Sequence, residues 1–185
     1  MNILNPETLR PGLLLHVRSN GFWGITIRKV LGSWGNHDSI VVMRQDGSPA
    51  IGDVEPHRAH LTTIEKYNER IIKGEYTVKV LEAIGATVGD ERLAAIWWME
   101  NIKGRSYDYW AFPRLLLKAI FGDWIPAAAG FEWAEWCTEG NYHAYLEGAG
   151  IDLYGKKSPT PMTTEKRTGI TFANVTNKHI MAAGE

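Results

Sequence analysis

The order of the apolar segments along the chain is the feature that most constrains its fold. Short runs rich in β-branched residues predict strands, and they gather in the first half of the chain. The strands are expected at 13–17, 39–43, 50–54 and 76–81. Helices are expected at 21–31, 91–102 (with Asp90 at its start) and 136–147, and a short helix or a turn at 64–72. Because strands come first and the longer helices follow, the sequence predicts an α+β domain.

The segments between these elements are predicted to be less regular. Asp46-Gly47 is a hairpin signal between two expected strands. Residues 56–63 are predicted as a loop, and residues 107–121 as partly helical. After Gly150 the hydrophobic periodicity fades, which predicts an irregular tail that wraps the domain.

Length and charge exclude several function classes. A chain of 185 residues is enough for one domain with a real core and short for two. The formal net charge is −1, whereas nucleic-acid modules usually carry a basic surplus, so no nucleic-acid partner is expected. The N-terminus lacks the features of a secretory signal, and no apolar run has the length of a membrane span. We therefore expect synthesis in the cytoplasm and no integral membrane segment.

The chain has a single cysteine, Cys137, so no disulfide can form within it. Cys137 lies at the predicted start of the helix 136–147, where the helix dipole and free backbone amides favour a thiolate and can bind an oxyanion. Three nearby acids oppose the thiolate unless they point away: Glu132, Glu135 and Glu139. A free cysteine is also often a small buried hydrophobic residue. Position alone therefore makes Cys137 only a candidate nucleophile.

A cysteine nucleophile needs a general base, and the chain has six histidines. They are His16, His37, His57, His60, His143 and His179. His143 follows Cys137 on the same predicted helix, at a spacing that points it to a different face. His37 precedes the strand 39–43, where an imidazole can face the start of a helix. Spacing alone leaves the choice of base open.

Motifs for bound cofactors are absent from the sequence. It contains no H-E-x-x-H, no G-x-G-x-x-G, no P-loop and no paired cysteines with metal-ligand spacing. His57 and His60 lie close to Asp53 and Glu55, and either a metal site or a solvated polar loop fits this pattern. The polar loop is the more common outcome, so we expect no cofactor and no metal.

Five short motifs occur in a fixed order along the chain. They are Leu9–Leu15, Trp34–Val42, Gly104–Asp108, Phe131–Gly140 with its Cys-Thr-Glu, and Gly148–Leu153. In this order they resemble the strand entry, His strand, G-x-x-Y-D element, C-S-E nucleophile motif and glycine stretch of circularly permuted papain-like hydrolases of the NlpC/P60 superfamily. Two residues depart from the pattern, because Leu13 stands in place of an acid and Thr138 in place of a serine.

This resemblance implies a permuted papain-like fold, in which a small antiparallel sheet packs against helices and the cysteine lies at a helix N-terminus. Residues 1–158 would form the catalytic domain, and residues 159–185 an irregular C-terminal tail that is packed on the domain or mobile. Cys137 would be the nucleophile and His37 its general base. Tyr107 matches a family tyrosine whose hydroxyl can support the oxyanion.

The resemblance also implies a third polar residue, on the strand after the His strand, that orients the imidazole. In the expected strand at this position, period-2 alternation puts Ile51, Asp53 and Glu55 on one face. Asp53 is the predicted orienting residue, because the matching family position is polar or acidic. Glu55 and His57 remain alternatives.

The function implied by this resemblance is that of a bacterial or phage cysteine hydrolase. It would cleave an amide or ester bond, in a cell-wall peptide or an acyl substrate, through a thioester intermediate. Leu13 and the acids near the thiol favour an alternative, a papain-like module with weak or no catalysis. Such a module would be a binding or structural component of a larger assembly, for example a phage particle or a secretion apparatus.

Overall fold

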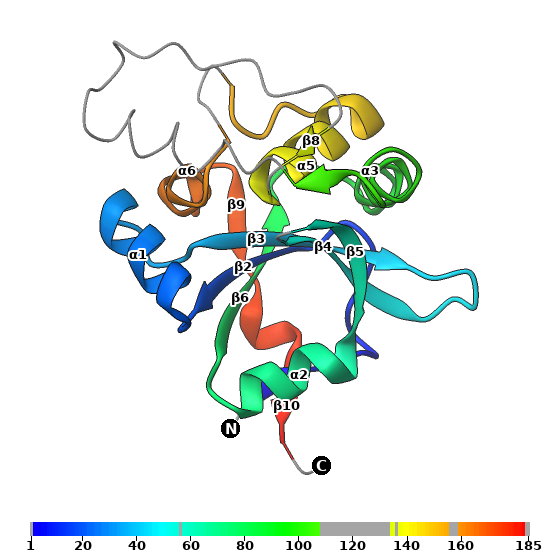
Figure 1. Ribbon diagram of the computed structural model, residues 1–185. Helices are drawn as coiled ribbons and strands as arrows, with labels where there is room; N and C mark the ends of the chain where they lie inside the picture. Colours follow the sequence, from blue (N-terminus) through cyan, green and yellow to red (C-terminus); the bar gives the residue numbers. More distant parts are fainter. Residues whose placement is uncertain (1, 56, 108–133, 136, 156–158, 184–185) are drawn as a thin grey trace, which may run out of the picture.

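The computed structural model describes residues 2–55, 57–107, 134–135, 137–155 and 159–183. Within this part the chain is α+β, with a mostly antiparallel sheet packed against helices (Figure 1). The sheet has eight strands in the order β8-β7-β5-β4-β3-β2-β6-β9. Their bounds are β2 (Leu14–Ser19), β3 (His37–Met43), β4 (Pro49–Glu55), β5 (Arg58–Thr63), β6 (Tyr76–Ala83), β7 (Ser106–Tyr107), β8 (Ala134–Glu135) and β9 (Phe172–Asn174). Only β7 and β8 pair in parallel within this sheet.

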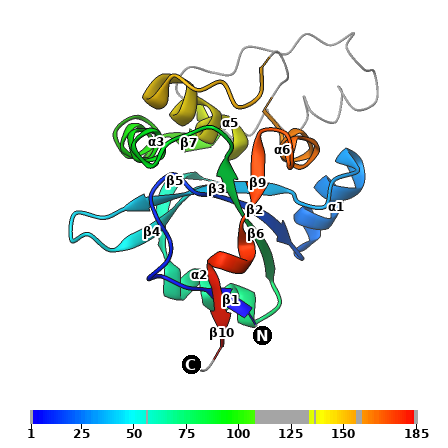
Figure 2. The same ribbon diagram turned by 180° about the vertical axis from the view of Figure 1, so that it is seen from behind.

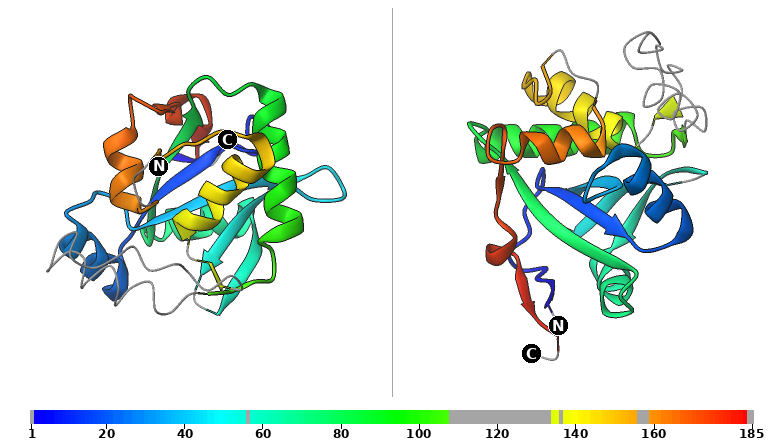
Figure 3. Two further views of the ribbon diagram at one scale, coloured as in Figure 1. Left: turned by 90° about the horizontal axis from the view of Figure 1, so that it is seen from above. Right: turned by 90° about the vertical axis from the view of Figure 1, so that its left-hand side faces the viewer.

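Helices cover both faces of the sheet, as Figures 1 and 2 show from opposite sides. On one face lie α3 (Val88–Asn101), α5 (Cys137–His143) and α6 (Pro161–Arg167), and a π-helical turn (Ala144–Gly148) continues α5. On the other face lies α2 (Ile64–Ile72), while α1 (Phe22–Leu31) flanks one end of β2 and β3. The view from above shows α3, α5 and α6 side by side across the strands (Figure 3).

Alternation along β3 divides the apolar core into two layers. Ile40 and Val42 pack with Trp98 in the layer beneath α3 and α5. Val41 between them packs with Tyr67 of α2 in the other layer. This period of two is the expected pattern for a strand buried on both faces, and it decides which face each polar residue of β3 occupies.

Two local predictions were wrong. Residues 56–63 were expected to be a loop, but Arg58–Thr63 forms β5, which pairs with β4 from Ala50–Thr63 to Glu55–Arg58. The prediction failed for two reasons. Pro56, in the short connection between β4 and β5, indicates a break in a strand, and many side chains of β5 are polar, which is typical of a loop. Likewise, Asp90 does not begin α3: Thr87 is the N-cap, and Asp90 completes a capping box as its third helical residue.

The C-terminal segment also differs from the expected irregular tail. Residues 159–183 contain α6, β9 and a last strand, β10 (Ile180–Ala182). β9 pairs with β6, and β10 pairs with β1 (Asn2–Leu4), so the two ends of the chain lie together. The hydrophobic pattern of this segment was too short to predict β9 and β10, because each gains its stability from pairing with a distant strand. Of the expected partly helical segment 107–121, residues 108–121 lie outside the described residues.

Because Phe172 of β9 is fully buried, its truncation is expected to destabilise the whole domain. Phe172→Ala should lower the free energy of unfolding by about 3–5 kcal/mol, since it removes a core aromatic ring and leaves a cavity. Ile170→Ala is the matched control: its side chain is 71 % exposed, so the change should be within about 0.5 kcal/mol. Urea unfolding followed by tryptophan fluorescence measures both. Equal midpoints for the two variants would mean that this segment does not belong to the core.

Candidate active site

His37 and Asp53 lie together on the face of the sheet that α2 covers. The β3–β4 register pairs Val41 with Ile51, so alternation places His37 and Asp53 on that same face. Nε2 of His37 lies 3.0 Å from Oδ1 of Asp53, which is hydrogen-bond distance. The structure therefore brings together two of the residues that the sequence analysis singled out.

Asp53 is completely buried and has a second hydrogen-bond donor. The hydroxyl of Ser39 donates to Oδ1 of Asp53, and it also lies 3.3 Å from the hydroxyl of Tyr67 on α2. Oδ2 of Asp53 has no hydrogen-bond partner among the described residues. A buried carboxylate with so few donors needs a positive partner, and His37 is the group placed to provide it.

Cys137 is the first residue of α5, in the core layer on the other face of the sheet, and is 5 % exposed. His37 is the first residue of β3, so the interaction between the two passes around the end of that strand. Burial by itself lowers the pKa of His37, but the negative charge of Cys137, hydrogen bonds to Asp53 and Cys137, and the charge of Asp53 together raise the pKa of His37 well above its ordinary value. An imidazole held between a thiolate and a carboxylate stays protonated more readily than a free one. His37 is therefore hydrogen-bonded to Asp53, and the charge of Cys137 at the start of α5 acts on it as well.

The two alternatives to Asp53 have other surroundings. Glu55 accepts hydrogen bonds from Arg70 at 2.7 Å and from the hydroxyl of Tyr76 at 3.0 Å. Burial raises the pKa of Glu55, but the bond from Arg70 and the nearby charges of His37 and Arg70 lower it overall. His57 is exposed, in the β4–β5 connection, with a φ of 98° that non-glycine residues rarely adopt. Asp53 is the acid whose hydrogen bond to His37 the structure shows.

The backbone of Tyr107 lies beside the segment that leads into Cys137. In the parallel pair of β7 and β8, Tyr107 is opposite Glu135. The side chain of Tyr107 lies outside what the structure describes, so its role as an oxyanion donor stays a prediction.

Ser39 and Tyr67 are polar neighbours of the site that the sequence analysis did not single out. A signal for Ser39 was present, because it is a polar residue two positions after His37 in an otherwise apolar strand, and alternation places it on the same face. Tyr67 carried no such signal, since the packing of α2 against the sheet brings it there.

The pair of His57 and His60 does not form a metal cluster. His60 of β5 lies 3.6 Å from Glu55, with Nε2 and Oε2 as the two atoms, and the β4–β5 register places it opposite Asp53. Across residues 2–183, with the gaps given above, no group of three or more His, Cys, Asp or Glu side chains could hold a metal ion.

No protein-family model and no curated protein matches the chain. Among solved structures, the chain is similar to one described as the metalloprotein yiiX from Escherichia coli O157:H7, DUF1105. The TM-score is 0.60 at 16 % sequence identity, over 96 % of this chain and 90 % of the other. A likeness at this identity shows a shared fold. None of the described helices is long and apolar enough to cross a membrane.

Proposed function

We propose that the protein is a thiol hydrolase that cleaves an amide or ester bond, with Cys137 as nucleophile, His37 as general base and acid, and Asp53 as the residue that orients the imidazole. The observation that carries this proposal is the hydrogen bond between the partly buried imidazole of His37 and Asp53, together with the charge of Cys137, which raises the pKa of His37. Nucleophile, base and orienting acid within reach of one another define a catalytic triad by geometry and role.

The order of the three residues along the chain supports a circularly permuted papain-like type. The base is on β3, the orienting acid on the next strand, and the nucleophile at the start of a later helix. This is the order implied by the family resemblance, whose motifs run from Leu9 to Leu153. A mostly antiparallel sheet with helices packed on it is compatible with such a domain.

The proposed reaction has two halves. In the first, His37 takes the thiol proton, the thiolate of Cys137 attacks the carbonyl carbon, and a tetrahedral oxyanion forms. The backbone N–H of Cys137 and the hydroxyl of Tyr107 are the proposed donors to that oxyanion. The imidazolium then protonates the leaving amine or alcohol as the carbonyl bond to it breaks, which leaves a thioester. In the second half, His37 takes a proton from water, the hydroxide adds to the thioester, and the carboxylic acid leaves as the thiol is restored.

The proposed reaction uses only groups of the protein itself. The similar structure from Escherichia coli is described as a metalloprotein, but no cluster suited to a metal ion occurs among the residues described in this chain. The proposal assigns the chemistry to the side chains of Cys137, His37 and Asp53 and to the backbone at the start of α5.

A trapped acyl-enzyme is the direct test of this proposal. Wild-type protein mixed with p-nitrophenyl esters of short and long acyl chains, and with N-acyl amides and cell-wall peptides, should gain the mass of one acyl group at Cys137 with at least one substrate. Cys137→Ala should gain none and should release no nitrophenolate above background. Intact-protein mass spectrometry and absorbance measure the two quantities. A non-catalytic binding module would instead show no acylation on any substrate, and equal turnover in both proteins would exclude Cys137 as the nucleophile.

A further inference from the structure

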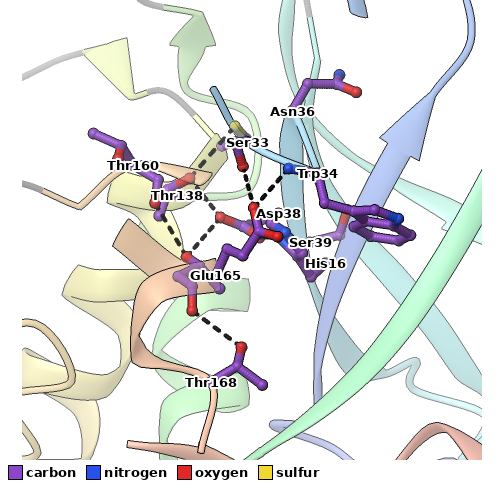
Figure 4. A network of polar contacts seen from close by, with 12 residues as sticks. His16, Ser33, Trp34, Asn36, Asp38, Ser39, Thr138, Thr160, Glu165 and Thr168 are labelled. Atoms are coloured by element: carbon purple, nitrogen blue, oxygen red, sulfur yellow. Dashed lines mark hydrogen bonds and ion pairs between the residues drawn. The ribbon is translucent and has the colours of Figure 1, made fainter. Parts of the chain in front are cut away.

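Asp38 is a buried carboxylate on the face of β3 opposite His37. It is 2 % exposed and accepts hydrogen bonds from residues of three other elements. Nδ1 of His16 on β2 lies 2.6 Å from Oδ1 of Asp38. The hydroxyls of Thr138 on α5 and Thr164 on α6 donate to Oδ2, at 2.7 Å and 2.9 Å. Figure 4 shows Asp38 between His16 and Thr138.

The position of these bonds in the sequence links them to the site. Asp38 directly follows His37, and Thr138 directly follows Cys137. One hydrogen bond therefore joins the residue after the proposed base to the residue after the proposed nucleophile. Because neighbouring residues share a backbone, a shift of Thr138 relative to Asp38 would also move Cys137 relative to His37.

The carboxylate of Asp38 is held in its charged form by its partners. Burial raises the pKa of Asp38, but the positive charge and hydrogen bond of His16 and the bonds from Thr138 and Thr164 lower it below its ordinary value. Hydrogen bonds to a charged acceptor are shorter and stronger than neutral ones. Removing one donor leaves part of a buried charge without a partner, so the local structure is expected to shift.

The C-terminal helix α6 adds a second connection on the same side. Glu165, next to Thr164, accepts hydrogen bonds through Oε2 from the hydroxyl of Ser33 at 2.8 Å and from the backbone N–H of Trp34 at 2.6 Å. Ser33 and Trp34, which Figure 4 shows beside Glu165, belong to the loop that precedes His37 in the sequence. Two adjacent residues of α6 thus bind both the carboxylate of Asp38 and the entry to the His strand.

We propose that Asp38 is a positioning residue of the active site: through Thr138 and Thr164, its carboxylate holds the start of α5 in register with β3 and so keeps the thiol of Cys137 in contact with His37. This inference rests on the proposed function. It also assigns a role in the site to α6, which lies beyond the motifs that carried the family resemblance.

The test compares Thr138→Val, which removes the hydroxyl at nearly constant volume, with Thr138→Ser, which keeps it. The readout is the rate of alkylation of Cys137 by iodoacetamide between about pH 5 and pH 10, because that profile reports the thiolate of the pair. In the wild type we expect the alkylation rate to rise at a pH below the ordinary thiol pKa of about 8.5, and we call this rise the low-pH inflection. For Thr138→Val we expect the low-pH inflection to move up by about one pH unit, toward that ordinary value. Thr138→Ser should keep the wild-type profile.

Two further variants separate positioning from general destabilisation. Thr138→Val also removes a 3.8 Å contact between its hydroxyl and Sγ of Cys137, whereas Thr164→Val removes only the other hydroxyl bonded to Asp38. Thr164→Val should move the inflection in the same direction; a shift in Thr138→Val alone would mean that the contact with Sγ is the cause and that the positioning role of Asp38 is wrong. Thr168→Val is the matched control on the same segment, since its hydroxyl donates to the backbone carbonyl of Thr164 at 3.2 Å and not to Asp38. Its profile should equal that of the wild type. Thermal unfolding of each variant shows that the profiles come from folded protein.

The outcomes distinguish the two proposals. If the wild type has a low-pH inflection and both valine variants at positions 138 and 164 keep it, the positioning role of Asp38 is wrong while the thiol–imidazole pair stands. If the valine and serine variants at position 138 shift alike, the hydroxyl is not the cause and the inference is also wrong. If the wild type itself is alkylated only above about pH 8.5, the pair does not exist and the proposed function falls together with the inference.

Discussion

Replacement of His37 by alanine is expected to remove the reactivity of Cys137 at low pH. At about pH 6 a thiol of ordinary pKa, about 8.5, is only about 0.3 % thiolate, whereas a thiolate paired with an imidazolium is largely ionised. An acidic thiolate is intrinsically less nucleophilic, which offsets part of that difference. We therefore expect His37→Ala to slow the alkylation of Cys137 by about 10- to 50-fold near pH 6, and to slow turnover of any acylating substrate by about 10²- to 10⁴-fold.

The direction of the pH dependence follows from the raised pKa of His37. A group whose pKa is higher in the folded state contributes stability that is complete below its unfolded value, about 6.5, and is lost as the pH rises through the folded value. The imidazolium of His37 is therefore expected to persist to higher pH in the folded protein than in the unfolded chain. Without His37, the lower inflection of the alkylation profile should vanish, and a single inflection near about pH 8.5 should remain.

His143→Ala is the control for this experiment. His143 lies at the last residue of α5, and burial lowers its pKa, so it offers no positive charge to the thiol at neutral pH. Its removal should leave the alkylation profile of Cys137 unchanged. Should His37→Ala keep the low-pH inflection while His143→Ala loses it, the base would have to be reassigned.

The sequence predicted the parts of the fold that depend on local patterns. The strands that begin near Leu14, His37 and Pro49 follow runs of apolar residues, and the structure has them at these places. Alternation placed Ile51, Asp53 and Glu55 on one face, and Asp53 and His37 are in contact there. A period of two or of 3.6 is a property of a few neighbouring residues, so it can be recognised without knowing what they pack against.

The parts that escaped prediction depend on contacts between distant residues. Thr164 lies 126 positions from Asp38 in the sequence, and no local pattern indicates that α6 will bind β3. β9 and β10 are three residues each, and they exist because β6 and β1 offer them unpaired edges. The choice among Asp53, Glu55 and His57 also needed the tertiary structure, because a carboxylate orients an imidazole only if it lies within hydrogen-bond distance.

The second large effect is expected for Asp53→Asn. The amide of asparagine has nearly the shape of the carboxylate, but it cannot balance the charge of an imidazolium, and its NH₂ group can present a donor where His37 needs an acceptor. The imidazole then loses its favoured tautomer and part of its basicity. Turnover should fall by about 10²- to 10⁴-fold, and the low-pH inflection in the alkylation of Cys137 should move toward the ordinary thiol value.

Glu55→Gln is the matched control, because it makes the same change of charge two residues along the same strand. Glu55 bonds to Arg70 and Tyr76, and it acts on His37 through its charge without a hydrogen bond to it in the structure. We expect a loss of turnover of about fivefold or less, since a charge that acts at a distance near the surface is partly screened by solvent. If Glu55→Gln has the larger effect and Asp53→Asn leaves the alkylation profile unchanged, Glu55 takes the orienting role. The hydrogen bond between Asp53 and His37 would then serve the stability of the sheet, and urea unfolding of Asp53→Asn would show that loss without a loss of turnover.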